Sequence, residues 1–313
     1  MLKRNIKILG QDAGKRLDVF LAGKFSEKSR NFWQKKIKGG EALLNGRPAK
    51  AHEFLRENDI VEIAVRLRKK ITSHESRIAD YKLIFECPDY LIVEKPAGLL
   101  THSDSKEPSL ARQLVKDFPE IKKVGEAGRR GIVHRLDRDV SGLLVIARTG
   151  KFFNCIKKQF RERKIKKIYL ALVYGKILKH EDVMRFAIGR GRGGRMAARP
   201  AIGDGKASET RFEVFKRFKN YTYLRVKILT GRTHQIRAHM LAYGHPIVGD
   251  KIYKLRRQGV RNPGCDRLFL HSHKLGFRDL KGEWMEYESR LPAGLEDCLK
   301  KLELVQTVSS CVQ

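Results

Sequence analysis

The residues of this chain best suited to chemistry lie between Gly131 and Thr149, in the stretch GIVHRLDRDVSGLLVIART. Asp137 stands there just before the apolar run from Leu143 to Ala147. A carboxylate that nearby guanidinium groups keep ionised, at the edge of a strand, can act as a nucleophile or as a base. The basic neighbours in the sequence are His134, Arg135, Arg138 and Arg148. Taken alone, Asp137 could equally be a helix cap or a surface residue of a turn.

The histidines and cysteines predict no metal site. His234 and His239 are five positions apart and lack the spacing of a zinc-binding helix. His271 and His273 alternate along an expected strand, so they are expected to pack or to form hydrogen bonds. The cysteines are widely spaced, odd in number and without a CxxC pair, which argues against a zinc site and a disulfide framework. We therefore expect reduced thiols at Cys87, Cys155, Cys265, Cys298 and Cys311.

The charge of the chain points to a polyanionic partner. Lys and Arg number 67 and Asp and Glu 35, which gives a net charge of +32 spread over 313 residues. Nucleic acid fits best, because contacts from Lys and Arg to phosphates supply affinity whatever the base sequence. No segment approaches the ~20 consecutive apolar residues of a membrane-spanning helix, and the N-terminus lacks the apolar core of a secretory signal. These features predict a cytoplasmic protein that does not bind membranes.

The elements that position these residues fall into two expected domains. Residues 14–65 carry helical apolar spacing at Lys15 to Ala22 and at Lys28 to Lys38. Short strands are expected at Ala42 to Leu44 and at Ile60 to Val65, and an Asn-Gly turn follows the first of them. This segment is therefore predicted to be a small α/β unit.

A resemblance becomes visible in this first unit. RLDVFLAGKFSEKSRNFWQKKI followed by LLNGRPAKAHEFLRENDIVEI resembles the alpha-L RNA-binding module first known from a ribosomal protein of the small subunit. It departs from that module at GGEA, where a glycine and a valine are usual, and at Asn58, where a glycine is usual. The resemblance implies RNA binding by this unit, and we expect Lys35 and Lys36 on its second helix to contact RNA.

The second domain is expected at residues 81–303, after a polar linker at 66–80, and a tail that could be disordered follows at 304–313. Its strands recur without regular alternation with helices, which favours an α+β fold with a mixed, largely antiparallel central sheet. Strands are expected at 82–86, 90–94, 143–147, 168–174, 208–215 and 221–229, and helices at 109–118, 152–163 and 233–243.

Four stretches of this second domain together resemble the pseudouridine synthases, specifically the family that modifies large ribosomal RNA and some transfer RNA. They occur in the family's order and the resemblance covers about residues 81–291. The stretches are EKPAGLLTH (94–102), HRLDRDVSGLLV (134–145), KKIYLALVYGK (166–176) and LTGRTHQIRAHMLAYGHPIVGDKIY (229–253). Val140 is the small departure, because threonine is usual there.

The resemblance implies the roles of three residues. Asp137 matches the family's catalytic aspartate, and Arg237 matches the arginine that pairs with it. Tyr169 matches the active-site tyrosine, which is expected to stack on the target uracil and could assist proton removal. Alone, Arg237 would be read as a helix-surface arginine and Tyr169 as an ordinary strand aromatic. The reaction needs no metal, redox partner or other cofactor.

The target uracil must leave its RNA stack, at a cost of about a few kcal/mol per flipped base. Arg135 matches the family position that enters the vacated space. The Gly- and Arg-rich loop at 189–208 lies where the family carries an RNA-gripping loop, and we expect it to order only on RNA. The expected RNA-binding residues are Arg135, Arg138, Arg190, Arg192, Arg195, Arg199, Arg232, His234, Lys35 and Lys36.

The leading hypothesis is an RNA pseudouridine synthase, an isomerase expected to act as a monomer on large-subunit ribosomal RNA. Transfer RNA is the alternative substrate, and a non-catalytic RNA-binding protein of ribosome assembly is the alternative class. A base-excising glycosylase would also flip a base but would release it to water. The sequence leaves open which uridines are modified, and whether Asp137 attacks the ribose, attacks the uracil or takes a ribose proton.

Overall fold

A computed structural model describes residues 2–25, 29–40, 42–65, 81–103, 107–126, 128–191, 196–199, 205–255 and 259–310. The chain divides into two compact units, Met1–Ser76 and Arg77–Gln313, each with its own core. The predicted linker at 66–80 lies outside the described residues. In the described part, no helix is both long and apolar enough to cross a membrane.

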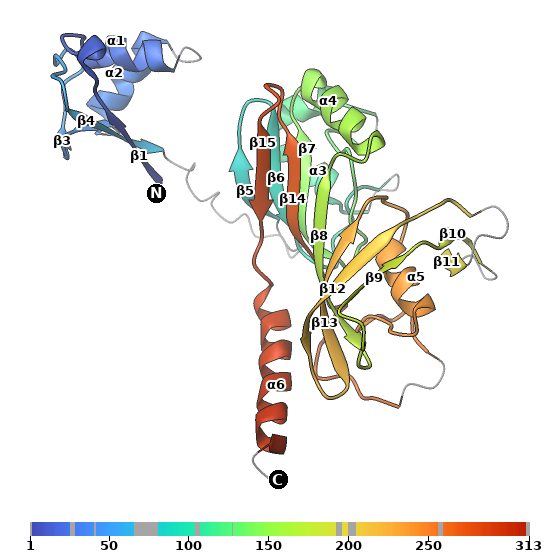
Figure 1. Ribbon diagram of the computed structural model, residues 1–313. Helices are drawn as coiled ribbons and strands as arrows, with labels where there is room; N and C mark the ends of the chain where they lie inside the picture. The colour runs from blue at the N-terminus through green and yellow to red at the C-terminus, as the bar shows by residue number, and fades with distance from the viewer. Residues whose placement is uncertain are drawn as a thin grey trace. The chain divides into compact units, whose positions relative to one another are not determined.

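The first unit is a four-stranded sheet with two helices (Figure 1). Its sheet order is β1-β4-β2-β3, and β1 pairs with β4 over its whole length. The unit therefore begins earlier than the predicted start at residue 14, because the first strand is part of its sheet. The elements are β1 (Leu2–Lys7), α1 (Leu17–Lys24), α2 (Arg30–Lys38), β2 (Ala42–Leu44), β3 (Arg47–Pro48) and β4 (Ile60–Val65).

Helix α2 separates a core face from a charged face. Ser29 caps it, since its side chain accepts a hydrogen bond from the Phe32 backbone N–H. Trp33 and Ile37, four positions apart, are buried in the core of this unit. Lys35, which lies between them in the sequence, is exposed. The helical spacing that turns Trp33 and Ile37 toward the core therefore turns this lysine toward the surface.

A buried carboxylate connects the two helices of this unit. Asp18 on α1 is fully buried and accepts hydrogen bonds from Arg16, Arg30 and the amide of Gln34. Burial alone raises the pKa of Asp18, but these hydrogen bonds outweigh it and lower the pKa to about 2. The ionised carboxylate thus fixes two partly exposed arginines on the surface.

We predict that Asp18→Asn destabilises the first unit at neutral pH by about 2 kcal/mol, the value of a pKa lowered from 3.8 to about 2. Because the folded pKa is lowered, this contribution is present above about pH 4 and is lost as the pH falls toward 2. Urea unfolding at several pH values should show a flatter acid limb for the variant. Asp12→Asn is the control, because among the described residues Asp12 forms an ion pair with the half-exposed Lys15 alone. Equal losses in both variants would contradict this account.

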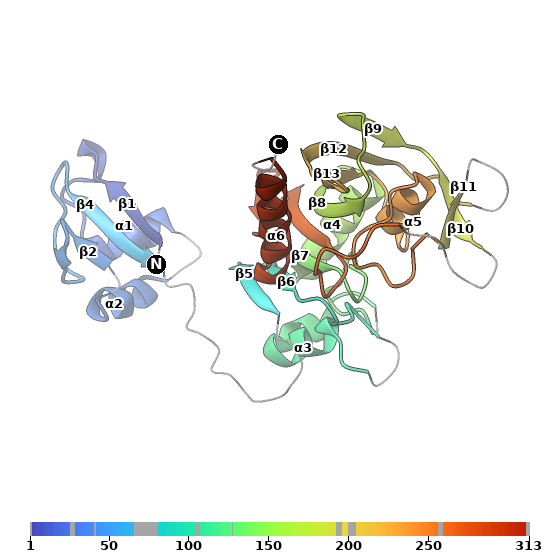
Figure 2. The same ribbon diagram turned by 90° about the horizontal axis from the view of Figure 1, so that it is seen from below.

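The second unit is built on a nine-stranded sheet of order β5-β6-β7-β14-β8-β13-β12-β9, with β15 paired to β14 (Figures 1 and 2). Every pairing is antiparallel except that of β7 with β14, which confirms the predicted mixed, largely antiparallel α+β fold. The strands are β5 (Lys82–Glu86), β6 (Tyr90–Lys95), β7 (Ser141–Ala147), β8 (Lys166–Tyr174), β9 (Glu181–Met184), β12 (Thr210–Arg217), β13 (Tyr221–Ile228), β14 (Leu270–Arg278) and β15 (Trp284–Glu288).

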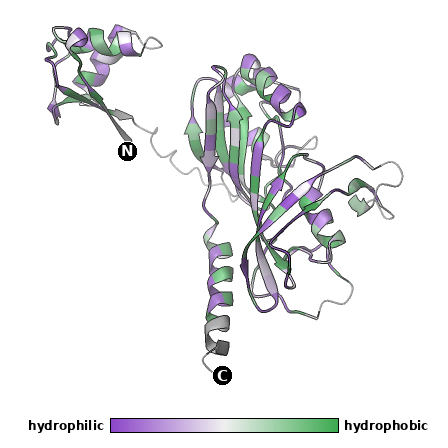
Figure 3. Cartoon of the chain, viewed as in Figure 1, coloured by the Kyte–Doolittle hydropathy of each residue, from purple (hydrophilic) through white to green (hydrophobic). Residues whose placement is uncertain are grey.

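Both faces of β6 and β7 are covered, which explains their continuous apolar sequences. Alternate residues such as Leu144 and Ile146 enter one core with α3 (Leu110–Asp117), while Leu143 and Val145 enter a second core with α4 (Gly150–Arg161). Figure 3 shows hydrophobic residues on these strands and alternating hydrophilic and hydrophobic residues on α4.

The parallel contact of β7 with β14 depends on a glycine. Gly142 pairs with Ser272 and has a φ of +119°. A Cβ atom at this position would lie 2.3 Å from the Ser272 carbonyl oxygen, which no side chain tolerates. Beyond this point β15 replaces β7 as the partner of β14, so the sheet branches here.

Two C-terminal expectations differ from the structure. Helix α6 (Ala293–Ser310) continues past residue 304, where a tail was expected, because Leu295, Cys298 and Leu302 form a buried helical stripe. Cys298 forms a disulfide with Cys265, so the expectation of reduced thiols is wrong for these two residues. Their separation of 33 positions gave no sequence signal of the contact. Cys87 and Cys155 are free, and Cys311 lies outside the described residues.

Part of the Gly- and Arg-rich loop forms regular backbone structure. Its ends form an antiparallel hairpin of β10 (Ala187–Arg190) and β11 (Met196–Arg199), which contacts α5 (Gln235–Ala242). Backbone pairing connects these two strands, and the expectation that the loop orders only on RNA stays a prediction. Residues 192–195 and 200–204 lie outside the described residues.

We predict that Gly142→Ala lowers the free energy of unfolding of the second unit by about 3 kcal/mol, because the clash is with backbone and the φ is unfavourable. Gly98→Ala is the control: its φ is +88° but nothing lies within 4 Å of the added Cβ, so about 1 kcal/mol is expected. Scanning calorimetry of the full chain measures both changes. Similar losses in the two variants would show that the close approach to Ser272 is unimportant.

Candidate active site

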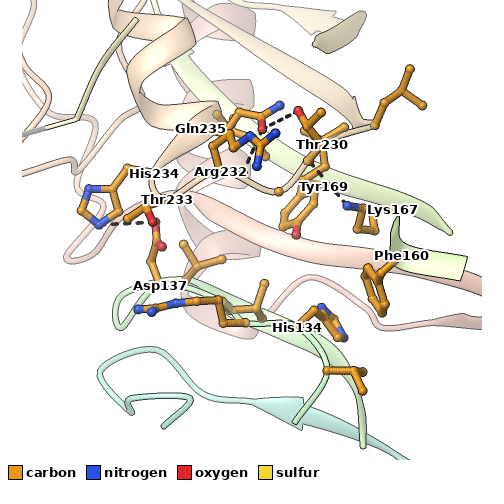
Figure 4. A pocket seen from close by; sticks show the side chains of 18 of the residues that line it. His134, Asp137, Phe160, Lys167, Tyr169, Thr230, Arg232, Thr233, His234 and Gln235 are labelled. Atoms are coloured by element: carbon orange, nitrogen blue, oxygen red, sulfur yellow. Dashed lines mark hydrogen bonds and ion pairs between the residues drawn. The ribbon is translucent and has the colours of Figure 1, made fainter. Parts of the chain in front are cut away.

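A cavity of about 580 Å³ opens in the second unit between the segment before β7, the first half of β8 and the segment from Ile228 to Arg237 (Figure 4). Asp137, Tyr169 and Arg237 all line it. The three residues predicted to act in chemistry, which are up to 100 positions apart, are thus brought into one cavity.

The backbone around Asp137 is anchored on both sides. The Thr101 hydroxyl donates to the Leu136 carbonyl at 2.8 Å and accepts from the Leu136 N–H at 3.1 Å. The carbonyl of Arg138 accepts from the Gly98 N–H at 2.8 Å and from the ammonium of the buried Lys95 at 3.0 Å. The segment after β6 therefore fixes the position of Asp137 before β7 begins.

One oxygen of Asp137 faces two cationic or polar groups at long distances. Its Oδ2 lies 3.5 Å from Nη1 of Arg237 and 3.8 Å from Nε2 of His234. The Asp137 side chain is 16% exposed. No hydrogen bond to its Oδ1 occurs in the part of the chain that the structure describes. The carboxylate is oriented by Arg237 but keeps an oxygen free for another group.

Arg237 is itself held by a second carboxylate. Its Nε and Nη2 donate to Asp250 at 2.7 and 2.8 Å, and its guanidinium lies over the ring of Tyr253 at 5.0 Å. Burial opposes the charge of Asp250, but the hydrogen bonds from Arg237 and from the backbone of Tyr253 and Ile252 hold its pKa below the usual value. This bidentate pair leaves only Nη1 of Arg237 for Asp137.

Tyr169 forms a buried wall of the cavity on β8. Burial raises the pKa of its hydroxyl, and the negative charge of Asp137 raises it further. The phenol is therefore protonated at neutral pH, and it can donate a hydrogen bond or present its ring face to a flat ligand.

The segment opposite Asp137 is fixed by the buried amide of Gln235. Its oxygen accepts from the Thr230 hydroxyl and from the Arg232 N–H, and its NH2 group donates to β12. His234 immediately precedes Gln235 and has a φ of +54°. This left-handed conformation costs a non-glycine residue about 1–2 kcal/mol. Its Nδ1 lies 3.0 Å from the Tyr253 hydroxyl. Backbone strain at such a position is typical of a functional site.

The other end of the cavity is lined by His134, Phe160 and Lys167 (Figure 4). The ring of His134 stacks on Phe160 at 4.8 Å, and its Nε2 accepts a hydrogen bond from the Val145 N–H. Burial, followed by the charge of Lys167, lowers the pKa of His134 to about 3. His134 is therefore neutral and supports the wall rather than carrying charge.

The predicted RNA-binding residues are not all brought together. Arg135, Arg232 and His234 line the cavity. Arg138 forms an ion pair with Glu107 and Arg190 is exposed on β10, and neither lines it. The remainder lie elsewhere: Arg192 and Arg195 are outside the described residues, only the backbone of Arg199 is described, and Lys35 and Lys36 belong to the first unit.

One expected neighbour of Asp137 is not close to it. Arg148 follows β7, roughly 20 Å further along the strand, where it pairs with Glu86 and Glu120. The prediction that Arg148 helps keep Asp137 ionised is wrong, because the intervening strand is fully extended. The guanidinium that faces Asp137 comes instead from α5.

The sequence analysis did not single out Asp250, Tyr253 or Lys167. Asp250 and Tyr253 lie in the stretch GDKIY, and an acidic residue followed by an aromatic gives no pattern that indicates an arginine partner. Lys167 resembles many other lysines of this basic chain until its burial is known. In the described part of the chain, no group of three His, Cys, Asp or Glu side chains could hold a metal ion.

Comparisons with known proteins identify the family of this chain. The family model described as RNA pseudouridylate synthase matches residues 89–242. A protein of Aquifex aeolicus described as an uncharacterized RNA pseudouridine synthase is 34% identical over 307 residues, 95% of this chain and 96% of that protein. Ribosomal large subunit pseudouridine synthase C of Yersinia pestis is 31% identical over 315 residues, 97% of each protein.

A solved structure supports the fold of the second unit. Human RNA pseudouridylate synthase domain containing 1 is 27% identical and matches with a TM-score of 0.59, covering 72% of this chain and 90% of that one. The family predicted from the four ordered motifs is thus confirmed. The chain belongs to the RNA pseudouridylate synthases, isomerases that convert uridine in RNA to pseudouridine.

Proposed function

We propose that this enzyme isomerises uridines of large-subunit ribosomal RNA in the cytoplasm, and that Asp137 is the reacting carboxylate. The observation that supports the site most strongly is the long contact between Asp137 and an arginine already committed to Asp250. The names of similar proteins, ribosomal large subunit pseudouridine synthases C and D, support the substrate. These similar proteins are bacterial, which supports a cytoplasmic location.

The reaction exchanges one bond to the ribose for another. The bond from C1′ to uracil N1 breaks, the ring turns, and a bond from C1′ to C5 forms. C5 then loses its proton and N1 gains one, so atoms and electrons balance without an oxidant or reductant. The free oxygen of Asp137 is available for the first step, either as a nucleophile or as a base toward a ribose proton.

Tyr169 is proposed to hold the detached ring. Its ring lines the same cavity as Asp137, and a flat pyrimidine can stack on it while it turns. Its protonated hydroxyl can donate a hydrogen bond, whereas a phenolate would repel the carboxylate. Removal of the C5 proton then needs a base, and Asp137 is the carboxylate that faces this wall.

The flipped nucleotide requires an opening in the RNA stem. Arg135 is exposed at the rim of the cavity, where its planar guanidinium can stack in the space that the uridine leaves. The first unit is proposed to add RNA affinity through the exposed face of α2, with Lys35 as one contact. A non-catalytic RNA-binding protein would not need a carboxylate among phosphate-binding cations, because the carboxylate repels the RNA phosphates.

Mapping pseudouridine in total RNA with and without this protein tests the substrate. We expect sites in large-subunit ribosomal RNA that disappear when the gene is deleted and return with the parent enzyme. Sites that appear only in transfer RNA would overturn the substrate proposal and keep the reaction. A chelator should leave turnover on folded RNA unchanged.

We predict that Asp137→Asn removes the carboxylate but not the shape of the side chain, and lowers the rate of conversion at least about 10²–10⁴-fold. RNA affinity should stay equal or rise slightly, because a negative charge is lost near the phosphates. Single-turnover conversion and filter binding measure the two effects. Asp139→Asn is the matched control, since Asp139 is exposed two positions away and does not line the cavity. A parent-like rate for Asp137→Asn would disprove its role.

We predict that Asp250 is a positioning residue. Asp250→Asn keeps an acceptor for the backbone N–H groups of Ile252 and Tyr253 but loses the charge that holds Arg237. Arg237 is then free to turn fully toward Asp137, so kcat should fall about 10²-fold with little change in KM. Equal changes in kcat and KM, or a KM effect alone, would contradict this. Thermal unfolding of the same variant shows whether the fold is retained.

A further inference from the structure

Lys167 is a buried cation with few partners. Its side chain is 7% exposed, and its ammonium lies 3.4 Å from the Thr230 carbonyl and 5.6 Å from the ring centroid of Phe160. No carboxylate among the described residues forms an ion pair with it. Burial lowers its pKa to about 8, so the amine still carries its proton at neutral pH. An ammonium buried without an anion is unfavourable, which indicates that a partner is missing.

Lys95 shows how the same fold satisfies a buried ammonium that has a structural role. It is fully buried and donates three hydrogen bonds, at 2.7, 2.8 and 3.0 Å, to the carbonyls of Leu99, Pro96 and Arg138. All three of its protons are used. Lys167 makes one long contact with a backbone carbonyl instead, and its side chain lines the cavity (Figure 4).

Three arginines also line this cavity, and two of them, Arg161 and Arg163, closely follow Phe160, whose ring lies beside the Lys167 ammonium. Arg129, Arg161 and Arg163 line it and are exposed. None of them forms an ion pair with a described residue, because the nearby acids Glu126 and Glu162 pair with lysines instead. Four cations that form no ion pair with a described carboxylate are typical of a site for a phosphate.

The position of Lys167 suits a phosphate next to the target nucleotide. Lys167 and Tyr169 are two positions apart on β8, so their side chains share one face of the strand, about 7 Å apart. Asp137 lies at the other end of the cavity (Figure 4). With the uracil on Tyr169 and the ribose at Asp137, the RNA strand continues within reach of Lys167.

We propose that the basic end of the cavity, formed by Lys167, Arg129, Arg161 and Arg163, binds a phosphate of the RNA strand beside the flipped uridine. Lys167 makes the buried contact with that phosphate, and the arginines extend it along the strand. This inference rests on the proposed function, because it takes Tyr169 and Asp137 as the site of the uridine.

The test uses the full chain and a fluorescent RNA stem–loop with uridines in its loop. Lys167→Met keeps the apolar part of the side chain and removes the charge. At physiological salt its affinity should fall at least about tenfold. The slope of log K against log salt should become shallower by about 0.7–1, the value of one phosphate contact. Lys167→Arg should retain most of the parent slope.

Lys166→Met is the matched control, because Lys166 lies on the opposite face of β8 and pairs with Glu286 at 2.9 Å. It should keep the parent slope. The midpoint of thermal unfolding of Lys167→Met should not fall, since no described ion pair is lost. A lower midpoint with an unchanged salt slope would indicate a structural lysine and overturn the proposal. A loss of affinity that is equal at all salt concentrations would also overturn it, and would place the contact on the uncharged base.

The two proposals can fail separately. The salt slope reports binding and does not depend on turnover. If the parent forms no pseudouridine but Lys167→Met still has a shallower slope, the proposed function alone is overturned. Conversion of uridine by the parent, with the same slope in Lys167→Met, would overturn the phosphate site alone.

Discussion

The guanidinium of Arg237 is shared unequally between two carboxylates, and the rest of the cavity depends on this arrangement. Asp250 takes two of its nitrogens at 2.7 and 2.8 Å, while Asp137 receives a third at 3.5 Å. In a chain with a net charge of +32, an isolated carboxylate would pair closely with an arginine. Because Asp250 already neutralises Arg237, the contact with Asp137 stays long and one of its oxygens remains open to a substrate.

The fold is what makes this unequal sharing possible. Asp137 precedes β7, Arg237 lies in α5, and Asp250 follows α5 by a short segment, so no local motif could bring the three together. The parallel contact of β7 with β14 requires Gly142. It sets the point at which the chain that follows Asp137 enters the sheet. The anchoring of the neighbouring backbone by Lys95 then limits the movement of this carboxylate.

Local sequence patterns predicted most of the features that depend on neighbouring residues of the chain. The apolar runs of β6 and β7 were visible because both faces are buried, and Tyr169 and Arg237 were found through ordered motifs. The disulfide between Cys265 and Cys298, the pairing of β14 and the role of Asp250 depend on contacts between distant segments. For Arg148 the error is the reverse. It is close to Asp137 in sequence, but the extended strand between them places it far away in space.

The buried cations of the second unit differ by what satisfies them, and this difference separates their roles. Lys95 is satisfied by three backbone carbonyls, so it stabilises a loop and has nothing left for a ligand. Arg237 is satisfied by carboxylates, so it can orient Asp137, the proposed reacting group. Lys167 has one long carbonyl contact among the described residues and faces the cavity. Net charge alone cannot separate these cases, because each lysine and arginine counts equally. The partners of each buried cation do separate them, and of these three described residues Lys167 is the one that we propose for a phosphate.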